Sequence, residues 1–542
     1  MGTNRGIAAL LVGALVAACA SESAAGPGAG PACGAAVATL ETLSVGMYAA
    51  LDPGSDSGCV SFPLNTSTSD VEYLVIAQSA GGIPGDSAPF ELRSARLVPT
   101  AVSPLMARRR ALRGPRGSIA AAFDHLLRGL ERGRHRPPAA LGPLPTSPGV
   151  ATVAPPALGS LRTFAVCADL NCVTFDTVTA RAQSVGAHVV IYVDTLAPAN
   201  GLDAADIDTL QQVFDTHVYS VDTAAFGSVS DVDSNGVVLT LMTPVVNRSV
   251  TAAECSAGGF VTGFFYPGDL DSIPGSPSNH GEIFYTVVAD PNGALSCAHT
   301  QADVKSFLPS TFLHELQHVI SFNQHVLIRN GNPEDIWLDE ALSSLAEELG
   351  GQSFLPDSST FYTYVSGDLE NAYEYLQDPG DHFLLQASDT VVADFGAGWL
   401  YARYLVDQFG DSLTHKLEQT TLTGTDNVAA QTGLPFTTTV TRWALANWVS
   451  DLPGFAPPPG LFYRSWSFRQ VYASVYQVPF PLVPSSGSGS QVNIAGSLRA
   501  GSGYYVDVVQ PPRGGSFTLF LGTSTGLVSP SVVPRLVVIR LR

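Results

Sequence analysis

The pattern of apolar and polar positions differs between the two ends and the middle of this chain. In residues 19–100, apolar and polar residues alternate between clusters of Gly, Pro and Ser, as in VEYLVIAQS and PFELRSARLV. This alternation is typical of strands that bury one face. Residues 471–542 repeat it in YYVDVVQ, SFTLFLG and RLVVIRLR, after the stretch SSGSGS. We therefore predict a small all-β domain at each end of the chain.

The middle of the chain mixes strand and helix periodicities. Apolar runs predict buried strands, for example at 188–194, and helical spacing continues through much of 307–450. Together these elements predict an α+β domain over residues 161–470. Residues 101–160 precede it and contain an arginine-rich stretch with helical spacing, followed by a proline-rich linker. We predict that this arginine-rich helix is solvated.

Residues 1–18 have the features of an export signal. Arg5 precedes the apolar run IAALLVGAL, which is too short to span a membrane. The run ends in VAAC, which resembles a bacterial lipobox, so cleavage would leave Cys19 as a lipid-modified first residue. Ordinary cleavage near Ala18 is the alternative. Because Ala20 follows the cysteine, we expect an exported lipoprotein of the bacterial outer membrane or cell surface.

The charge of the chain excludes one class of partner. The formal net charge is -20, although residues 104–138 hold nine arginines against Asp124 and Glu131. A chain this acidic is a poor match for nucleic acid. We therefore expect no nucleic-acid partner, and a membrane contact only through the lipid on Cys19.

Six cysteines follow Cys19, which is an even number in a chain expected to be exported. Disulfides are therefore favoured over thiol chemistry. No pair has C-x-x-C spacing, which argues against a cysteine-rich zinc site. Nearest-neighbour pairing is one of several possible connectivities, and it would join Cys33 to Cys59, Cys167 to Cys172 and Cys255 to Cys297.

The stretch STFLHELQHVISFNQH, residues 310–325, carries the strongest chemical signal. On a helix, His314 and His318 lie on one face a turn apart, so both imidazoles can bind one zinc ion. Glu315 stands beside them in an H-E-x-x-H arrangement, in which the glutamate is a general base and not a ligand. A purely structural pair of histidines on a buried helix is the alternative.

A third ligand would separate these two interpretations. The segment WLDEALSSLAEEL, residues 337–349, predicts a second amphipathic helix beginning shortly after the first. Glu340 lies near its start and completes a set of two histidines and one carboxylate, which is typical of a catalytic zinc site. Glu347 lies two turns further along and could only support the site, while Asp339 and Glu348 should turn toward solvent or a supporting partner.

These two segments resemble the gluzincin group of metallopeptidases, and most closely its hyicolysin family. The resemblance spans roughly residues 160–450 and includes FGSVSDVDSNGVVLTLMTPVVN, GFFYPGD, SNHGEIFYTV and GAGWLYARYLVDQFG. It implies His314, His318 and Glu340 as Zn²⁺ ligands and Glu315 as the catalytic base. It also implies a zincin-like domain, with a mixed sheet beside the active-site helix and a largely helical lower half.

Two departures from related motifs limit what can be transferred. Phe395 occupies the place where gluzincin aminopeptidases carry a proton-donating tyrosine, so the second electrophile is open among Tyr401, Tyr404, His382 and His415. The metzincin pattern needs a third histidine six residues after the pair, and His325 misses that position by one. We therefore predict that His325 lies on the helix surface.

Two further stretches carry weaker signals. DVDSNG, residues 231–236, resembles the start of a calcium loop, but Met242 stands where the loop needs a bidentate glutamate. We therefore favour a turn. EIFYTVV, residues 282–288, is either an edge strand that pairs with an extended substrate or an ordinary buried strand.

These features favour zinc-dependent endopeptidase activity. The alternatives are a surface lipoprotein with a degenerate zinc centre that binds a partner, and an aminopeptidase. The sequence shows no G-x-M-E-N motif for anchoring a substrate amine. The endopeptidase is therefore the preferred hypothesis.

Overall fold

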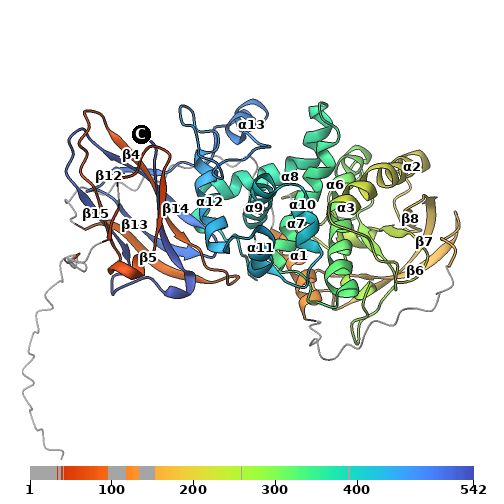
Figure 1. The fold of residues 1–542 in the computed structure, drawn as a ribbon. Coiled ribbons are helices and arrows are strands. Elements are labelled where there is room, and N and C mark those ends of the chain that lie inside the picture. Colours follow the sequence, from red (N-terminus) through yellow and green to blue (C-terminus); the bar gives the residue numbers. More distant parts are fainter. Residues whose placement is uncertain are drawn as a thin grey trace, which may run out of the picture.

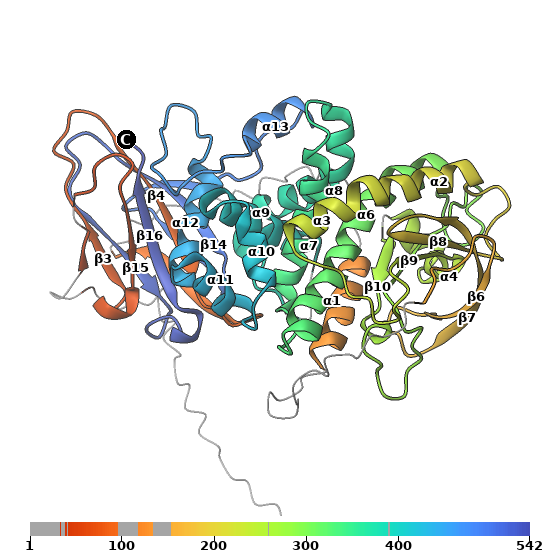
Figure 2. The same cartoon turned by 45° about the vertical axis from the view of Figure 1, so that its right-hand side comes forward.

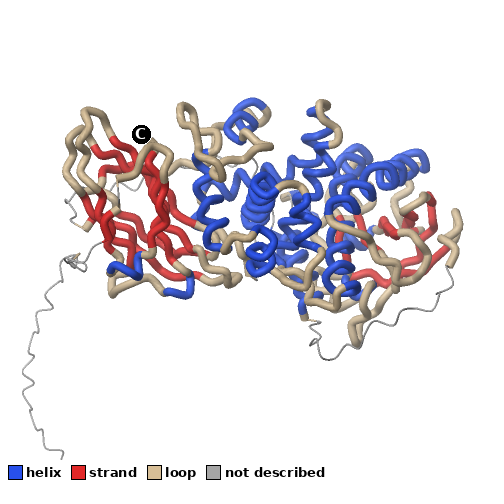
Figure 3. The backbone as a smooth tube through the Cα atoms, viewed as in Figure 1, coloured by secondary structure: helices blue, strands red, loops and turns tan. Residues whose placement is uncertain are grey.

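Strands at the two ends of the structure enclose a largely helical centre. The computed structural model describes Cys33 and residues 38–40, 42–95, 118–133, 153–257, 259–387 and 391–542. Figure 1 shows a β-sandwich, a central group of helices and a second sheet with its own helices, placed in a row. Figure 3 separates the strands at both ends from the helices between them. This mixture of helices and sheets confirms the predicted α+β class.

The sandwich is built from both ends of the chain. One sheet has the order β1-β3-β15-β5-β13 and the other has the order β12-β14-β4-β16-β2. N-terminal and C-terminal strands therefore share both sheets, and the prediction of two separate β domains is wrong. The strands are β1 (Ala38–Thr39), β2 (Tyr48–Leu51), β3 (Cys59–Phe62), β4 (Val71–Ser79), β5 (Ser87–Ser94), β12 (Ser485–Ser488), β13 (Asn493–Arg499), β14 (Gly503–Gln510), β15 (Phe517–Gly522) and β16 (Pro534–Arg540).

Strand β4 shows why the two ends need each other. It lies between β14 and β16 and pairs antiparallel with both. Its alternate side chains are apolar on both faces: Val75 faces the sandwich core, whereas Leu74 and Ile76 join the core of the helical centre. The sheet also meets helix α12 (Phe436–Val449) through hydrogen bonds, including one from the Tyr505 hydroxyl to the Ala444 carbonyl oxygen at 2.8 Å. Neither terminal segment could bury these faces alone.

The second sheet is mixed, as the resemblance implied. Its order is β10-β11-β9-β8-β7-β6, in which β8, β9 and β11 run parallel to one another. Strand β11 therefore lies inside the sheet, and β10 takes the edge position that residues 282–288 were considered for. The strands are β6 (Leu161–Cys167), β7 (Phe175–Val185), β8 (Val189–Asp194), β9 (Val238–Met242), β10 (Gly263–Phe265) and β11 (Ile283–Thr286).

This sheet buries both faces, which explains its continuous apolar strands. In β8, Val189 and Ile191 pack with the helices of the main core, whereas Val190 and Tyr192 belong to a second core. That second core includes Phe123 and Leu127 of α1 (Ser118–Arg132). Figure 2 shows α1 next to α7 and near β10. The prediction that the arginine-rich helix is solvated is therefore wrong for α1, because its apolar face and Arg128 are buried.

Long helices form the centre of the molecule. Within the described residues, no helix is both long and apolar enough to cross a membrane. The remaining helices are α2 (Ala204–Val213), α3 (Tyr219–Ala225), α4 (Pro244–Arg248), α5 (Ala252–Ser256), α6 (Gln301–Phe322), α7 (Ile336–Gln352), α8 (Ser358–Gln377), α9 (Val392–Phe409), α10 (Ser412–Glu418), α11 (Gly424–Thr432) and α13 (Phe468–Ser474). The helix α6 continues into a π-helical turn, η5 (Asn323–Ile328).

Three disulfides confirm the predicted oxidation of the six later cysteines. The pairs are Cys33–Cys59, Cys167–Cys172 and Cys255–Cys297, which is the nearest-neighbour connectivity. Cys19 lies outside the described residues.

We predict that a chain ending at residue 484 loses the fold of its N-terminal strands. Removing β12–β16 leaves β4 and β5 without their neighbours in the sheets. Hydrogen exchange followed by mass spectrometry should then show fast exchange across residues 71–94. The peptides of α6 serve as the internal reference for the rest of the molecule. Protection of β4 equal to that in the full chain would contradict the shared sandwich.

Candidate functional site

Helix α6 positions the two histidines and the glutamate of the H-E-x-x-H stretch. Its first turn is capped by Thr300, whose hydroxyl accepts from the Asp303 amide while the Asp303 carboxylate accepts from the Thr300 amide. The rings of His314 and His318 are 4.9 Å apart between centroids. His318 is buried and His314 is partly exposed. The i, i+4 spacing therefore places both imidazoles on one face of α6, one turn apart.

Helix α7 brings Glu340 to the same point. Glu340 Oε2 lies 3.5 Å from His314 Nε2, and Glu340 Oε1 lies 3.8 Å from His318 Nε2. One donor atom from each of the three residues falls within 4.8 Å of the other two. Tetrahedral zinc with bonds of roughly 2.0–2.2 Å needs donors roughly 3.4 Å apart. The three residues expected from the sequence therefore meet, and the two histidine–glutamate separations of 3.5 and 3.8 Å lie close to this spacing.

The carboxylate of Glu340 has unmet hydrogen-bonding capacity. The residue is 1% exposed, and its Oε1 has no hydrogen-bond donor among the described residues. A buried carboxylate oxygen without a donor is costly unless a cation lies beside it, and Arg128 Nε, at 4.0 Å from Oε1, is beyond hydrogen-bond distance. Two neutral imidazole nitrogens and one carboxylate oxygen are a typical zinc donor set. The chemistry and the burial of these residues fit a zinc ion.

Two further carboxylates orient the histidines. His314 Nδ1 lies 2.9 Å from Glu347 Oε1, and His318 Nδ1 lies 3.1 Å from Asp339 Oδ2. When each Nδ1–H donates to its carboxylate, the Nε2 lone pair remains free to bind a metal. Glu347 and Asp339 thus lie outside the donor set, where the sequence analysis expected a supporting role.

Glu348 faces away from the donor set and anchors α7. Its carboxylate accepts hydrogen bonds from the indoles of Trp399 at 3.0 Å and Trp466 at 2.8 Å. Arg403 lies 3.4 Å from the same carboxylate, which is fully buried. These contacts come from α9 and from the segment before α13. They fix the rotation of α7 and therefore the direction in which Glu340 points.

Arg128 of α1 is a site residue that the sequence analysis missed. Its guanidinium lies 2.7 Å from Glu131, 3.7 Å from Asp339 and 4.0 Å from Glu340, and it is 2% exposed. It also donates to the Phe265 carbonyl oxygen of β10 at 3.2 Å. The sequence did contain a signal for this role. The apolar residues of α1 recur with helical spacing on the same face as Arg128, and such a face is expected to be buried.

The charges around the histidines shift several pKa values. Burial raises the pKa of Asp339, but His318 and Arg128 outweigh burial and bring it to about 2. Burial lowers the pKa of His314, but Glu340 and Glu347 hold it well above its usual value. Without a metal, these carboxylates therefore favour the protonated form of His314. The proton supplies the positive charge that the surrounding carboxylates require.

A cavity of about 590 Å³ opens at this cluster. His314 and Glu315 line it from α6, and Asp124 lines it from α1. Val261, Thr262 and Gly263 line it beside the edge strand β10, and Tyr364 lines it from α8. Glu315 is 5% exposed, so it reaches the cavity while most of its surface is covered. A molecule in this cavity would lie against Glu315 and His314, whereas His318 and Glu340 are not among the lining residues.

The four residues considered as a second electrophile do not line this cavity. Tyr401 and Tyr404 are buried, and their hydroxyls meet Thr439 and the Gly460 carbonyl oxygen at 2.7 Å each. His382 lies 3.6 Å from Asp394, and His415 is exposed on α10. Phe395 does line the cavity, and so does Tyr364. Tyr364 is therefore the phenol that shares this cavity with Glu315.

His325 lies in the interior and not on the helix surface as predicted. It sits on the π-helical turn η5, with no exposed side-chain area, 3.4 Å from Glu418 and 3.8 Å from Glu334. Burial lowers its pKa, but the two glutamates outweigh burial and raise the pKa of His325 to about 9. The turn that follows α6 points this imidazole inward. His325 therefore supports the α6–α7 connection, and it belongs to none of the possible metal-binding groups among the described residues.

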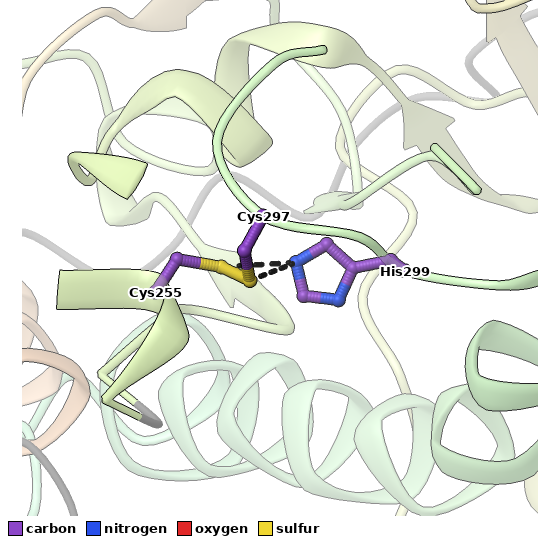
Figure 4. Close-up of side chains that lie close together, drawn as sticks. All are labelled: Cys255, Cys297 and His299. Carbon is purple, nitrogen blue, oxygen red and sulfur yellow. Dashed lines mark hydrogen bonds between the residues drawn. A yellow bond between two sulfur atoms is a disulfide. The ribbon is translucent and has the colours of Figure 1, made fainter. Parts of the chain in front are cut away.

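A second group of possible metal ligands, Cys255, Cys297 and His299, is excluded as a metal site because its cysteines form a disulfide. Figure 4 shows the His299 ring directed at the Cys255–Cys297 disulfide, with Nε2 3.4 Å from Cys255 Sγ and 3.8 Å from Cys297 Sγ. Metal binding needs thiolates, and these sulfurs are bonded to each other. The disulfide instead ties α5, beside the cavity, to the segment that leads into α6.

No family model matches this chain, and no curated protein matches it in sequence. The function must therefore be argued from the residues at the cavity.

We predict that Glu340→Gln and Glu347→Gln differ in zinc affinity, because Glu340 is a proposed zinc ligand and Glu347 only orients His314. Glu340→Gln removes a charged donor and should lower zinc affinity by far more than Glu347→Gln, which should lower it about 10- to 100-fold. Zinc titration with a competing chelator measures both affinities. Equal affinities for the two variants, or a larger loss in Glu347→Gln, would reverse the assignment.

We predict that His325 makes the protein less stable as the pH rises. Its pKa is about 9 in the folded state, against ~6.5 when unfolded. The folded state thus holds the proton more tightly, and this stabilisation is complete below the unfolded pKa and is lost as the pH rises through the folded one. The free energy of unfolding, measured by urea titration, should fall across that window. His325→Gln should flatten the fall and cost roughly 3–5 kcal/mol near neutral pH.

The exposed His415→Gln provides the matched control, because it removes a histidine from the same half of the molecule without touching a buried carboxylate. It should keep the slope of the unmodified chain. An unchanged slope in His325→Gln would rule out the buried ion pair as its source.

Proposed function

We propose that this protein is a zinc-dependent endopeptidase that cleaves peptide bonds within protein or peptide chains. The observation that supports this most directly is the convergence of His314, His318 and Glu340 on one point, with Glu315 beside them at an open cavity. The same residues are the ones implied by the resemblance to gluzincin metallopeptidases. On this proposal, the mixed sheet and the helical centre are the two halves of a zincin-like domain.

The residues at this point would have defined tasks, and His314, His318 and Glu340 would hold the zinc ion. A zinc ion at the site would supply Lewis acidity, which lowers the pKa of a bound water toward ~7 and polarises a substrate carbonyl. Glu315 would accept the proton of the attacking water and return it to the leaving amine. Asp339 and Glu347 would keep the imidazole Nδ1–H groups fixed while this happens.

The edge strand β10 offers a place for an extended substrate. Within the described strands it pairs only with β11, so no strand covers its other edge, where the Phe265 carbonyl oxygen accepts from Arg128 and Gly263, at the start of β10, lines the cavity. A Cβ added at Gly263 would come within 2.7 Å of Thr311 Cγ2 and 2.9 Å of the Tyr285 carbonyl oxygen. The glycine therefore allows β10 to approach α6 closely. A substrate strand added to β10 would run past Glu315.

Tyr364 is our candidate for stabilising the negative charge that develops on the substrate oxygen. Burial raises its pKa to about 12, so the phenol keeps its proton at neutral pH and can donate it in a hydrogen bond. It takes the role that Phe395 cannot fill. Donors of this kind contribute roughly 10²–10³-fold to the rate when they are well placed.

The location of the protein remains part of the proposal. The lipobox-like VAAC and the apolar run before it support export and a lipid on Cys19. The three disulfides suit an oxidising compartment. The expected setting is the bacterial outer membrane or cell surface.

We predict that purified protein cuts a peptide library at internal bonds and that a zinc chelator abolishes the cuts. Glu315→Gln should bind about one zinc per chain and lose most of the activity, because its carboxylate moves protons and is not a ligand. Tyr364→Phe should keep zinc and lower kcat roughly 100-fold with little change in KM. Mass spectrometry of the library and a metal assay measure both.

The outcomes separate the alternatives. Cuts confined to the first bond of each peptide would indicate an aminopeptidase. Bound zinc with no hydrolysis by the unmodified chain would favour a non-catalytic protein that binds a partner. Near-normal turnover by Glu315→Gln would refute the assignment of the base.

A further inference from the structure

A second group of carboxylates lies at one end of the mixed sheet, away from the histidines. Residues 231–236 lead into β9, and Glu282 directly precedes β11. Strands β9 and β11 are parallel neighbours in register, with Ile283 opposite Leu239. Segments that precede parallel neighbours meet at the same sheet end. The topology therefore brings Glu282 onto the 231–236 turn, although about 50 residues separate them in the sequence.

The carboxylates of this group face one another. An oxygen from each of Asp231, Asp233 and Glu282 lies within 4.8 Å of the other two. Asp231 is exposed and Asp233 is partly buried, whereas Glu282 is 1% exposed. Like charges held this closely repel one another unless protons or a cation intervene.

Glu282 provides independent evidence for a bound cation. Its Oε1 accepts from the Val232 amide at 2.8 Å, so the side chain is directed into the turn. Its Oε2 is buried and makes no hydrogen bond of normal geometry, although the Ser230 hydroxyl lies close enough to act on the carboxylate. Burial nevertheless raises the pKa of Glu282, and the Ser230 hydroxyl offsets only part of that effect. A buried carboxylate oxygen in this condition is costly unless a cation binds it.

The turn also orders its oxygen atoms. Asp231 accepts from the Gly236 amide at 3.1 Å, and Asp233 accepts from the Asn235 amide at 3.2 Å. Ser234 and Gly236 both have positive φ, at 61° and 74°, which curls the chain around the carboxylates. The D-x-D-x-N-G spacing is that of the first half of a calcium loop. Met242 stands at the twelfth position, where a calcium loop needs a glutamate, and it is buried in β9. Glu282 supplies the missing carboxylate from a later segment of the chain.

The charge and donor type select the kind of ion. The three carboxylates carry up to three negative charges, and Arg162 offsets part of this charge by acting on Asp233. The group therefore keeps a net negative charge. Oxygen donors without nitrogen or sulfur favour a hard divalent cation over zinc. We propose that Asp231, Asp233 and Glu282 bind a calcium ion at the end of the mixed sheet. The ion joins the turn before β9 to the start of β11, and it is separate from the zinc chemistry proposed for His314 and His318.

Calcium binding by the full chain tests this directly. Isothermal titration with Ca²⁺ on zinc-loaded protein should give about one site with a Kd in or below the millimolar range. Thermal unfolding should shift upward with Ca²⁺ in a saturable way, and much less with Mg²⁺, which requires stricter octahedral geometry. Peptidase activity is not the readout, so a failed enzyme assay would leave this result intact.

Variants decide which residues hold the ion. Asp231→Asn, at an exposed position that should fold normally, should weaken Ca²⁺ binding at least about tenfold. Glu282→Gln should abolish the thermal shift. Asp176→Asn, an exposed acid on β7 outside the group, should bind like the unmodified chain. No heat of binding up to ~10 mM Ca²⁺, or unchanged binding in both Asp231→Asn and Glu282→Gln, would overturn the proposal.

Discussion

The compensation of buried negative charge is the constraint on which the centre of this structure depends. Glu340, Asp339 and Glu315 are buried at the contact of α6 and α7, and Glu347 is only partly exposed. The cost of removing charges from water far exceeds what a few hydrogen bonds return, so positive charge must be provided nearby. Arg128 provides one such charge, and His314 provides another when it holds a proton. A divalent cation would meet the same requirement with better geometry.

This requirement explains why elements far apart in the sequence are packed around two helices. Helix α1 contributes Arg128, while α9 and the segment before α13 fix α7 through Glu348. On the opposite side, Glu334 and Glu418 hold His325 at the turn between α6 and α7. These contacts hold α6 and α7 at the turn that joins them and on the faces that point away from the donor atoms. Their shared face can then keep donor atoms close together at the cavity.

Local spacing in the sequence was enough to predict the core of the candidate site. His314, Glu315 and His318 belong to one helix, and Glu340 opens the next one, so a one-dimensional pattern carries most of the geometry. Arg128, Tyr364 and Glu282 were missed because their roles depend on contacts between distant segments. His325 was misplaced because it was judged only by the metzincin spacing, which it misses by one residue, whereas its burial depends on Glu334 and Glu418 from later segments.

The same distinction applies to the fold. Alternation predicted strands at both ends of the chain, and helical spacing predicted the centre, because each pattern reports local burial. The pattern does not say which strand is the neighbour of which. Strand β4 is as consistent with a small N-terminal sheet as with its true place between β14 and β16. The pairing is set by the helical centre, which offers α12 as the surface that both terminal segments must cover.

The interleaved sandwich also imposes an order on biosynthesis. Val75 of β4 pairs with Val506 and Val538, so its neighbours are made more than 400 residues later. A ribosome must therefore finish nearly the whole polypeptide before this sheet can close. Until then, the apolar strands at the N-terminal end have no native partner and are exposed to wrong pairings. A chain with this topology gains from being kept unfolded until its synthesis is complete, as passage through a translocon in extended form would ensure.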